Sequence, residues 1–287
     1  MSNDKNQIMR ATGLLVIEAI NSNPNGDPDR ESDPRQRPDG LGEISPVSFK
    51  RKLRDLVEDE KGPVWMELKS RLTLNDEEFQ VLESRGRDRG KIKDELKDDA
   101  KIFKKKYWDA RVFGNTFLEE NASTSIKTGV VQFGMGLSVA PVIIERHTNT
   151  NKAGVESDKD RGMAPMAYRI IQHGIYCMPF FVNPSAAHKS GCTVQDIQLL
   201  LALIPYAYAH SRSYVRPNVE ILHAWHIEHK SALGSCSDFK LIDALTPTRK
   251  AQYEQIASTS RKEYDIPTAL SQELQAKVAG CNDLMEF

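Results

Sequence analysis

The sequence predicts a protein of the α+β class, because segments with strand periodicity alternate with segments of helical periodicity along one chain. Three observations carry this prediction. Residues 11–20 form a short apolar run bounded by turn residues, residues 131–140 alternate with period two, and residues 194–204 have the apolar spacing of a core-facing helix. The expected order is strand, basic helix, insertion, hairpin, helix, strand. This order is compatible with a ferredoxin-like (split βαβ) core with elaborated loops.

The first strand, residues 11–20, leads into a polar loop and then a helix. Four prolines between residues 24 and 38 exclude regular structure as far as residue 40, because each fixes φ and lacks an N–H. Ser45 is expected to cap the following helix, with Pro46 at its first position. The apolar stripe of this helix consists of Phe49, Leu53, Leu56 and Val57.

Residues 61–106 are rich in charge, and two glycines interrupt them. We interpret this segment as a helical insertion, in which Lys91–Lys106 forms a solvated helix with few apolar anchors. Its basic end, residues 104–106, is more typical of a solvated face than of a specific binding site.

A projecting hairpin is expected at about residues 140–170. The strand through Glu145 is followed by a polar excursion, residues 147–166, and by an apolar strand that returns at Tyr168 and ends near Phe181. In residues 131–140, one face is expected to be core and the other small and polar. Such a face suits a sheet over which a ligand chain lies, although glycines that mark a bulge produce the same pattern. The expected core face consists of Val131, Phe133, Met135, Leu137 and Val139, and the small face of Gln132, Gly134, Gly136, Ser138 and Ala140.

The last third of the chain is expected to contain a helix from Thr193 and a strand at residues 219–228, followed by weaker helical signals near residues 248–257 and 269–279. The resulting division is a core of residues 1–60 and 107–235, a helical insertion of residues 61–106, and a C-terminal helical extension of residues 236–287.

Composition indicates an ordinary soluble, cytoplasmic protein. The formal net charge of −1 argues against a generally basic surface, so any nucleic-acid contact depends on local patches. The four cysteines show no close pairing, which favours neither a zinc site nor a disulfide framework. No apolar stretch is long enough to span a bilayer and no signal segment is evident at the N-terminus, so no membrane partner is expected.

The basic helix is the first candidate site. Lys50, Arg51 and Arg54 clear the apolar stripe on a helical wheel, and Ser48 supplies a further hydrogen-bond donor, which together suit a phosphate backbone. The alternative is an ordinary surface helix whose cations pair with Asp55, Glu58 and Asp59. Both interpretations remain open on the sequence alone.

Other constellations are weaker. The aspartates of the loop, Asp27 and Asp33 among them, fit turn chemistry better than cation binding. His223 and His226 lie on opposite faces of one expected strand, so they do not form a shared metal site. His147 and His173 are possible general bases, but no nucleophile is paired with either in sequence. No cofactor, metal or catalytic motif is predicted.

The hairpin arm offers a different kind of contact. Met163 and Met166 near its return, with Arg161 and Arg169, form an apolar wedge flanked by cations, which is suited to insertion between stacked bases. The alternative is a flexible loop whose methionines pack on the stem.

Taken together, these motifs resemble a known family. Asn23-Pro24-Asn25-Gly26-Asp27-Pro28 followed by Ser48-Phe49-Lys50-Arg51-Lys52-Leu53-Arg54 is similar to the CRISPR-associated backbone subunit of Cascade, subtype I-C, in the RAMP superfamily. Asp109-Ala110-Arg111-Val112-Phe113-Gly114 and Gly129-Val130-Val131-Gln132-Phe133 resemble its middle segment. The resemblance covers about residues 10 to 230.

The resemblance implies a modified RNA-recognition-type core with a projecting thumb. It also implies a non-catalytic subunit that assembles in several copies along a CRISPR RNA and presents it to target DNA. The other implied partners are the guide-processing, large and small subunits of the complex. The implied RNA-binding residues are Ser48, Lys50, Arg51, Arg54, Arg111, Gln132, Gly134, Met163, Met166 and Arg169.

Two other functions remain open. Related backbone subunits of type III complexes cut target RNA with a loop aspartate, for which Asp27 or Asp33 is the candidate here. A plain protein-interaction module without nucleic acid is the third hypothesis, and copurified nucleic acid would distinguish it from the other two.

Overall fold

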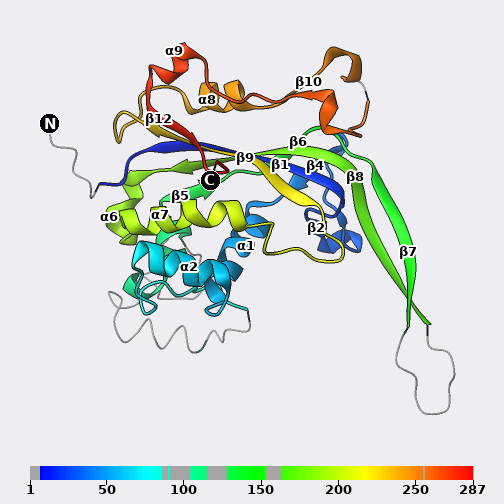
Figure 1. Cartoon of the computed structure of the whole chain (residues 1–287), viewed down its shortest axis with the longest axis horizontal. Coiled ribbons are helices and arrows are strands. Elements are labelled where there is room, and N and C mark those ends of the chain that lie inside the picture. The colour runs from blue at the N-terminus through cyan, green and yellow to red at the C-terminus, as the bar shows by residue number, and fades with distance from the viewer. Residues whose placement is uncertain are drawn as a thin grey trace.

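One large antiparallel sheet organises the chain (Figure 1). The computed structural model describes residues 7–85, 90, 104–114, 128–152, 163–254 and 256–286. The strands of the sheet are β1 (Ala11–Ser22), β4 (Leu41–Ile44), β5 (Val131–Phe133), β6 (Gly136–Pro141), β7 (Ile144–Lys152), β8 (Met163–Val182), β9 (Val219–His229) and β12 (Val278–Asp283). Their order is β12-β9-β1-β8-β6-β4, and β5 and β7 also pair with β8.

Helices and short elements surround this sheet. The α-helices are α1 (Pro46–Glu58), α2 (Pro63–Leu72), α5 (Trp108–Phe113), α6 (Ala187–Ser190), α7 (Val194–Leu203), α8 (Asp238–Leu245) and α9 (Gln272–Gln275). The 3-10 turns are η1 (Pro28–Arg30), η2 (Pro184–Ala186), η3 (Ile204–Tyr206), η4 (Ala251–Tyr253) and η5 (Arg261–Glu263). Two-residue strands pair as β2 (Gly26–Asp27) with β3 (Asp33–Pro34) and as β10 (Thr248–Arg249) with β11 (Tyr264–Asp265). The predicted α+β class is confirmed.

Both faces of the sheet are covered, which explains why β1 is an unbroken apolar run. Helices α1, α2, α6 and α7 lie on one face, and α8, α9 and β10 on the other (Figure 1). Leu15 and Ile17 of β1 pack in the core on the side of α1, whereas Leu14 and Val16 pack with residues of α8. A strand whose side chains are buried on both faces loses the alternation that a half-exposed strand shows.

Two predicted helix starts are confirmed, one at Ser45 from its capping signal and one near Thr193 from apolar spacing. Ser45 caps α1, its Oγ accepting a hydrogen bond from the backbone N–H of Ser48, and Pro46 is the first helical residue. Thr193 and Asp196 form a reciprocal capping box at the start of α7. The stripe predicted for α1 is buried throughout.

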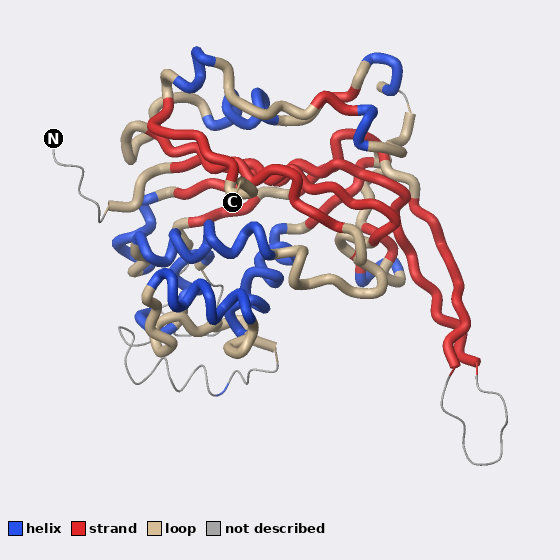
Figure 2. Tube along the Cα trace, viewed as in Figure 1, coloured by secondary structure: helices blue, strands red, loops and turns tan. Residues whose placement is uncertain are grey.

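Strands β7 and β8 extend beyond the rest of the sheet as a two-stranded hairpin (Figure 2). The pairing runs from Ile144↔Ile171 to Lys152↔Met163, so much of the expected polar excursion is strand. Polar side chains do not prevent this pairing, because backbone hydrogen bonds hold an antiparallel ladder whichever side chains project from it. Residues 153–162 of the expected arm lie outside the described residues.

The expected single strand at residues 131–140 is divided by a break at Gly134 and Met135. Val131 and Phe133 are buried as predicted, but beyond the break Gly136, Ser138 and Ala140 are the buried set and Leu137 and Val139 are only half-buried. A shift of one residue exchanges the two faces of a strand. The expected continuous core face is therefore wrong after Gly134.

The segment expected to be an insertion contributes to the core. Val64, Trp65 and Leu68 of α2 are buried in the same cluster as α1 and α7, and Phe79 joins them. The first part of this segment, residues 63–79, is therefore packed into the core of the protein. The solvated helix expected at Lys91–Lys106 falls largely outside the described residues.

The C-terminal part is mixed rather than helical. The helix expected near residues 248–257 is instead β10 followed by η4, and the helix expected near residues 269–279 is shortened to α9, with β12 beginning at Val278. β12 pairs with β9 at the edge of the main sheet, and α8 has no counterpart among the predicted elements. Short-range signals failed here because these segments take their conformation from pairing with distant strands.

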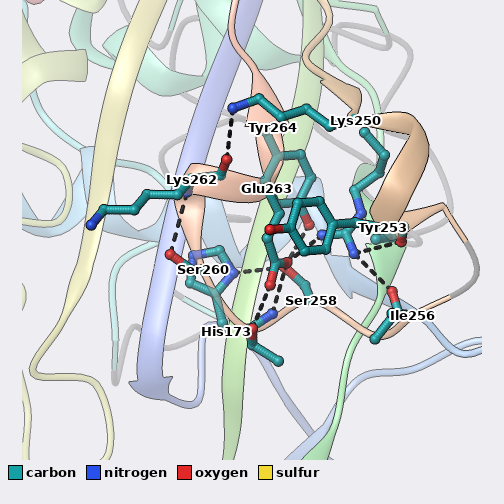
Figure 3. A network of polar contacts seen from close by, with 12 residues as sticks. His173, Lys250, Tyr253, Ile256, Ser258, Ser260, Lys262, Glu263 and Tyr264 are labelled. Carbon is teal, nitrogen blue, oxygen red and sulfur yellow. Dashed lines mark hydrogen bonds and ion pairs between the residues drawn. The ribbon is translucent and has the colours of Figure 1, made fainter.

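A buried polar network fastens this C-terminal part to β8 (Figure 3). The Nδ1 of His173 lies 2.7 Å from Ser258 Oγ, which lies 2.5 Å from the hydroxyl of Tyr264. Arg249 and Glu263 form an ion pair at 2.5 Å beside it. These contacts join β8, β10 and β11 across a long stretch of sequence.

Among the described residues, no helix is long and apolar enough to cross a bilayer.

Candidate nucleic-acid interface

Arg54, predicted to lie on an exposed cationic edge of α1, is buried inside the protein. It is 4% exposed, and its Nε donates to Asp109 Oδ2 at 2.8 Å. Asp109 also accepts hydrogen bonds from the backbone N–H groups of Leu82 and Glu83. The prediction of an exposed Arg54 is wrong, because a carboxylate distant in sequence neutralises it within the core.

Arg51 is also neutralised, though nearer the surface. Its Nε lies 2.8 Å from Asp55 Oδ1, and its guanidinium also pairs with Glu58 and donates to the carbonyl of Glu83. For Arg51 the alternative interpretation, an ordinary surface helix with its own ion pairs, describes the structure.

Lys50 differs from both arginines. Its Nζ lies 5.0 Å from the centroid of the Phe113 ring, and no ion pair joins it to a carboxylate among the described residues. Burial lowers the pKa of this lysine. Ser48 is half-buried at the start of the same helix. Of the predicted α1 site, Lys50 and Ser48 therefore remain candidates for a phosphate contact.

Arg111, the candidate from the second motif, has a structural position. Its guanidinium makes two hydrogen bonds to the carboxylate of Asp196, at 3.0 Å and 2.6 Å, and a third to the carbonyl of Lys104. Asp196 is fully buried and also belongs to the capping box of α7. These donors are used inside the protein, so the position of Arg111 gives no support to the expected RNA contact.

The glycine face of β5 and β6 is occupied by the protein itself. A Cβ on Gly134 would lie 2.8 Å from Cγ of Pro179, and the N–H of Gly134 donates to the carbonyl of Pro179. Gly134 therefore marks the break between the strands, which was the alternative to close approach by a ligand. Gln132 is exposed on β5 and remains a candidate.

The hairpin residues have separate positions. Arg169 lies on β8 near the body of the protein, where it pairs with Asp33 at 3.0 Å and with Glu31. The backbones of Met163 and Met166 belong to β8, opposite Lys152 and Asn149. The side chains of both methionines lie outside what the structure describes, so the apolar wedge stays a prediction.

Lys52 was not among the predicted site residues. It is 5% exposed, its Nζ donates to Ser211 Oγ at 3.1 Å, and it lies 4.9 Å from the centroid of the Tyr208 ring. Burial, followed by the charge of Arg216, lowers its pKa to about 8. The signal was present in the sequence, since Lys52 follows Phe49 by three residues and thus falls on the core-facing side of α1.

An aromatic row on the hairpin stem was also missed. His147 of β7 stacks on its cross-strand neighbour Tyr168 of β8 with ring centroids 5.3 Å apart. Tyr214, from the turn before β9, meets Tyr168 edge to face at 5.4 Å and is 57% exposed. Aromatic side chains beside cations are typical of surfaces on which bases stack.

Two arginines flank Tyr214 in the sequence Arg212-Ser213-Tyr214-Val215-Arg216. No ion pair joins either arginine to a carboxylate in the part of the chain that the structure describes. Arg212 is exposed, and the Nε of Arg216 donates to the backbone carbonyl of Asn23 at 2.8 Å. We call the set formed by His147, Tyr168, Arg212, Tyr214 and Arg216 the stem surface.

The histidines of β9 lie in different surroundings. His223 stacks on Trp225, and its Nδ1 lies 2.7 Å from Asp283 Oδ2, while burial lowers the pKa of His226 to about 4. Within the described residues, no three metal-ligating side chains gather in one place.

His173 does have a hydroxyl partner, which sequence spacing did not reveal. Its ring lies between Ser258 Oγ at 2.7 Å and Glu18 Oε1 at 3.2 Å, in the order of a nucleophile, base and acid. Ser258 is fully buried, and its hydroxyl also contacts the hydroxyl of Tyr264. A fully buried hydroxyl with two protein partners is not accessible to a substrate, so we interpret the network as structural.

The fold belongs to the class of α+β proteins built on a large antiparallel sheet. The model of the family CRISPR-associated protein Cas7 matches residues 9–268 of the chain. The protein belongs to this family, which bears out the family-level resemblance. No curated protein matches the sequence.

Several solved structures are similar to this chain. A chain of "CRISPR RNA-guided surveillance complex, pre-nicking" is 14% identical with a TM-score of 0.48, over 76% of this chain and 77% of that one. A chain of "CRISPR RNA-guided surveillance complex" is 18% identical with a TM-score of 0.41, over 74% and 68%. A chain of "Cryo-EM structure of the Type III-B Cmr-beta bound to cognate target RNA" is 11% identical with a TM-score of 0.43, over 77% and 61%.

Proposed function

We propose that this protein is a non-catalytic subunit that binds CRISPR RNA in several copies, as the backbone of a type I-C Cascade complex. The observation that carries the proposal is the stem surface, where exposed Tyr214 stands between two arginines that have no carboxylate partner among the described residues. Membership of the Cas7 family supports the same function. Such a surface binds phosphates and base faces without strong sequence preference, so base pairing by the guide supplies specificity.

The fold supports a ferredoxin-like core for this function. Its central strands have the order β9-β1-β8-β6, with α1 between β1 and β6 in sequence and α7 between β8 and β9. The β7–β8 hairpin corresponds to the expected thumb, and Lys50 with Gln132 corresponds to the palm. In a filament of such subunits, the thumb contacts the next copy of the chain. The complex also contains the guide-processing, large and small subunits. Within it, the guide RNA pairs with target DNA in the cytoplasm.

The ribonuclease alternative finds little support at its candidate residues. The two carboxylate oxygens of Asp33 each contact an arginine, Arg146 at 2.7 Å and Arg169 at 3.0 Å. The hydrogen bond from Arg146 lowers the pKa of Asp33. Asp27 caps the turn η1 by accepting from the N–H of Asp29. We expect no regularly spaced cuts when the assembled complex is incubated with complementary RNA and magnesium, whether Asp27 is intact or replaced by alanine.

RNA affinity as a function of salt tests the proposed surface. Arg212→Gln is expected to reduce the slope of log affinity against log salt by about 0.7, the value for one phosphate contact on a single strand. Tyr214→Leu is expected to weaken binding about tenfold or more with an unchanged slope, because it removes a stacking face and no charge.

Arg71→Gln on α2 is the matched control, since it removes one exposed cation from another part of the protein. Fluorescence anisotropy with labelled single-stranded RNA measures all three variants. Wild-type protein that binds no RNA and copurifies without nucleic acid would instead indicate a protein-interaction module. Site variants that behave like Arg71→Gln would exclude the stem surface.

A further inference from the structure

Two arginines face each other across the hairpin. Arg146 of β7 and Arg169 of β8 are direct partners in the antiparallel register. Like charges in directly opposed positions destabilise a strand pair. The carboxylate of Asp33 offsets this repulsion, with Oδ2 at 2.7 Å from Arg146 Nη2 and Oδ1 at 3.0 Å from Arg169 Nε.

Asp33 belongs to a different part of the chain, which is itself anchored to the core. It lies in β3, paired with Asp27 of β2. Asn25, next to this pair, accepts a hydrogen bond from the N–H of Ser45, the cap of α1, at 2.7 Å, and its own carbonyl accepts from Arg35. Asp33 is 8% exposed, so water competes little for its oxygens. One buried carboxylate thus joins both strands of the hairpin to the start of α1.

The contact between Asp33 and the two arginines lies where the hairpin leaves the main sheet. β8 pairs with β1 only as far as Ile171, opposite Ser22, and beyond that residue β7 is its partner strand among the described residues. Arg169 lies two residues past this point. The contact therefore acts at the base of the free hairpin, where a small change of angle displaces the far end by a larger distance.

We propose that Asp33 is a positioning residue that sets the direction of the β7–β8 hairpin, so that the hairpin meets the next copy of this chain along the RNA. The proposal rests on the function proposed above. In this role Asp33 contacts no RNA and acts through the two arginines, and its removal affects the contact between copies more than the binding of a single copy.

Hairpin direction is measured first, in the isolated protein and without RNA. A pair of spectroscopic labels on non-natural amino acids at Thr148 of β7 and Met66 of α2, both exposed, reports the distance between hairpin and core and leaves the native cysteines unlabelled. Asp33→Asn keeps the size of the side chain but removes its charge. We expect its distance distribution to be clearly broader than that of the wild-type protein, and a narrow, unchanged distribution would overturn the proposal.

Arg146→Gln is the second variant, because it removes one arm of the contact from an exposed position and avoids changes in the buried loop. Arg146→Gln is expected to broaden the distance distribution as well, but by less than Asp33→Asn does. Asp29→Asn is the matched control, since Asp29 is exposed, lies in the same loop, carries the same charge and pairs with neither arginine. Broadening in Asp29→Asn as large as in Asp33→Asn would overturn the proposal.

RNA binding then separates the roles. On an RNA long enough for one copy, Asp33→Asn is expected to bind at least as tightly as the wild-type protein, because it releases Arg146 from its carboxylate while Arg169 keeps its pair with Glu31. On an RNA long enough for several copies, cooperativity between copies is expected to fall about tenfold. Wild-type protein that binds no RNA would refute the proposed function while the distance measurement still tests Asp33. Unchanged cooperativity would refute the positioning role.

Discussion

Helix α1 and the stem surface both carry cations that are close together in sequence, but the fold treats them differently. On α1, Arg54 and Arg51 are paired with Asp109, Asp55 and Glu58. On the stem surface, Arg212 and Arg216 have no carboxylate partner among the described residues. Whether a cation is available to RNA therefore depends on which carboxylates the fold places beside it. A cluster of basic residues in the sequence does not show whether those carboxylates are present.

The largest expected effect is on the free energy of unfolding, when the buried ion pair between Arg111 and Asp196 is broken. Asp196→Ala leaves Arg111 buried without its carboxylate and removes the capping box of α7, so we expect it to lower the free energy of unfolding by about 3–5 kcal/mol. Denaturant titration followed by circular dichroism measures the loss. Asp55→Ala, at the half-exposed pair with Arg51, is the control and is expected to cost less than about 1 kcal/mol. Equal losses in the two variants would contradict the distinction between buried and surface pairs.

Lys52 is expected to have an intermediate effect on the free energy of unfolding, and this effect depends on pH. Its pKa is about 8 in the folded protein against 10.5 for an unperturbed lysine. Between these values the unfolded chain binds more protons, so the free energy of unfolding rises with pH across this window, by as much as about 3 kcal/mol. Below pH 8 both states are protonated and the contribution of Lys52 to the slope disappears.

Lys52→Met should remove this contribution, which is measured as the difference in unfolding free energy between variant and wild type from pH 7 to pH 10. Lys240→Met, which removes an exposed lysine of α8, is the control. A difference that stays constant with pH would show that Lys52 is not desolvated as the structure indicates.

The smallest expected effect sharpens the comparison within α1 itself. Arg51→Gln is expected to change RNA affinity by less than about twofold and stability by less than about 1 kcal/mol, since its charge is already neutralised at the surface. Lys50→Gln, one residue away, is expected to weaken RNA binding more, because no ion pair holds Lys50 among the described residues. RNA affinity at fixed salt compares the two, and a larger loss in Arg51→Gln would reverse their assignment.

Much of the fold was predictable where the signal is local. The cap at Ser45, the start of α7 near Thr193 and the apolar run of β1 each depend on neighbouring residues, and each was predicted. The break at Gly134 was left open as an alternative, because alternation of large and small residues continues across it. The conformation of residues 248–283 was missed because β12 forms by pairing with β9, far away in the sequence.

The candidate site also divides into residues that the sequence indicated and residues that depend on distant parts of the chain. Lys50 and Gln132 remain where the sequence indicated, whereas Arg54 and Arg111 were assigned to RNA although each has a buried carboxylate partner. Tyr168 and Tyr214 were missed, since only the turn before β9 brings Tyr214 against the hairpin.

The sequence by itself determined the α+β class, the starts of its main helices and the family resemblance, because caps, periodicity and ordered motifs are properties of neighbouring residues. The tertiary structure alone decided which cations are free, because Coulombic pairing acts between groups that are adjacent in space and distant in the chain. For the same reason only the fold revealed that Asp33 lies between Arg146 and Arg169.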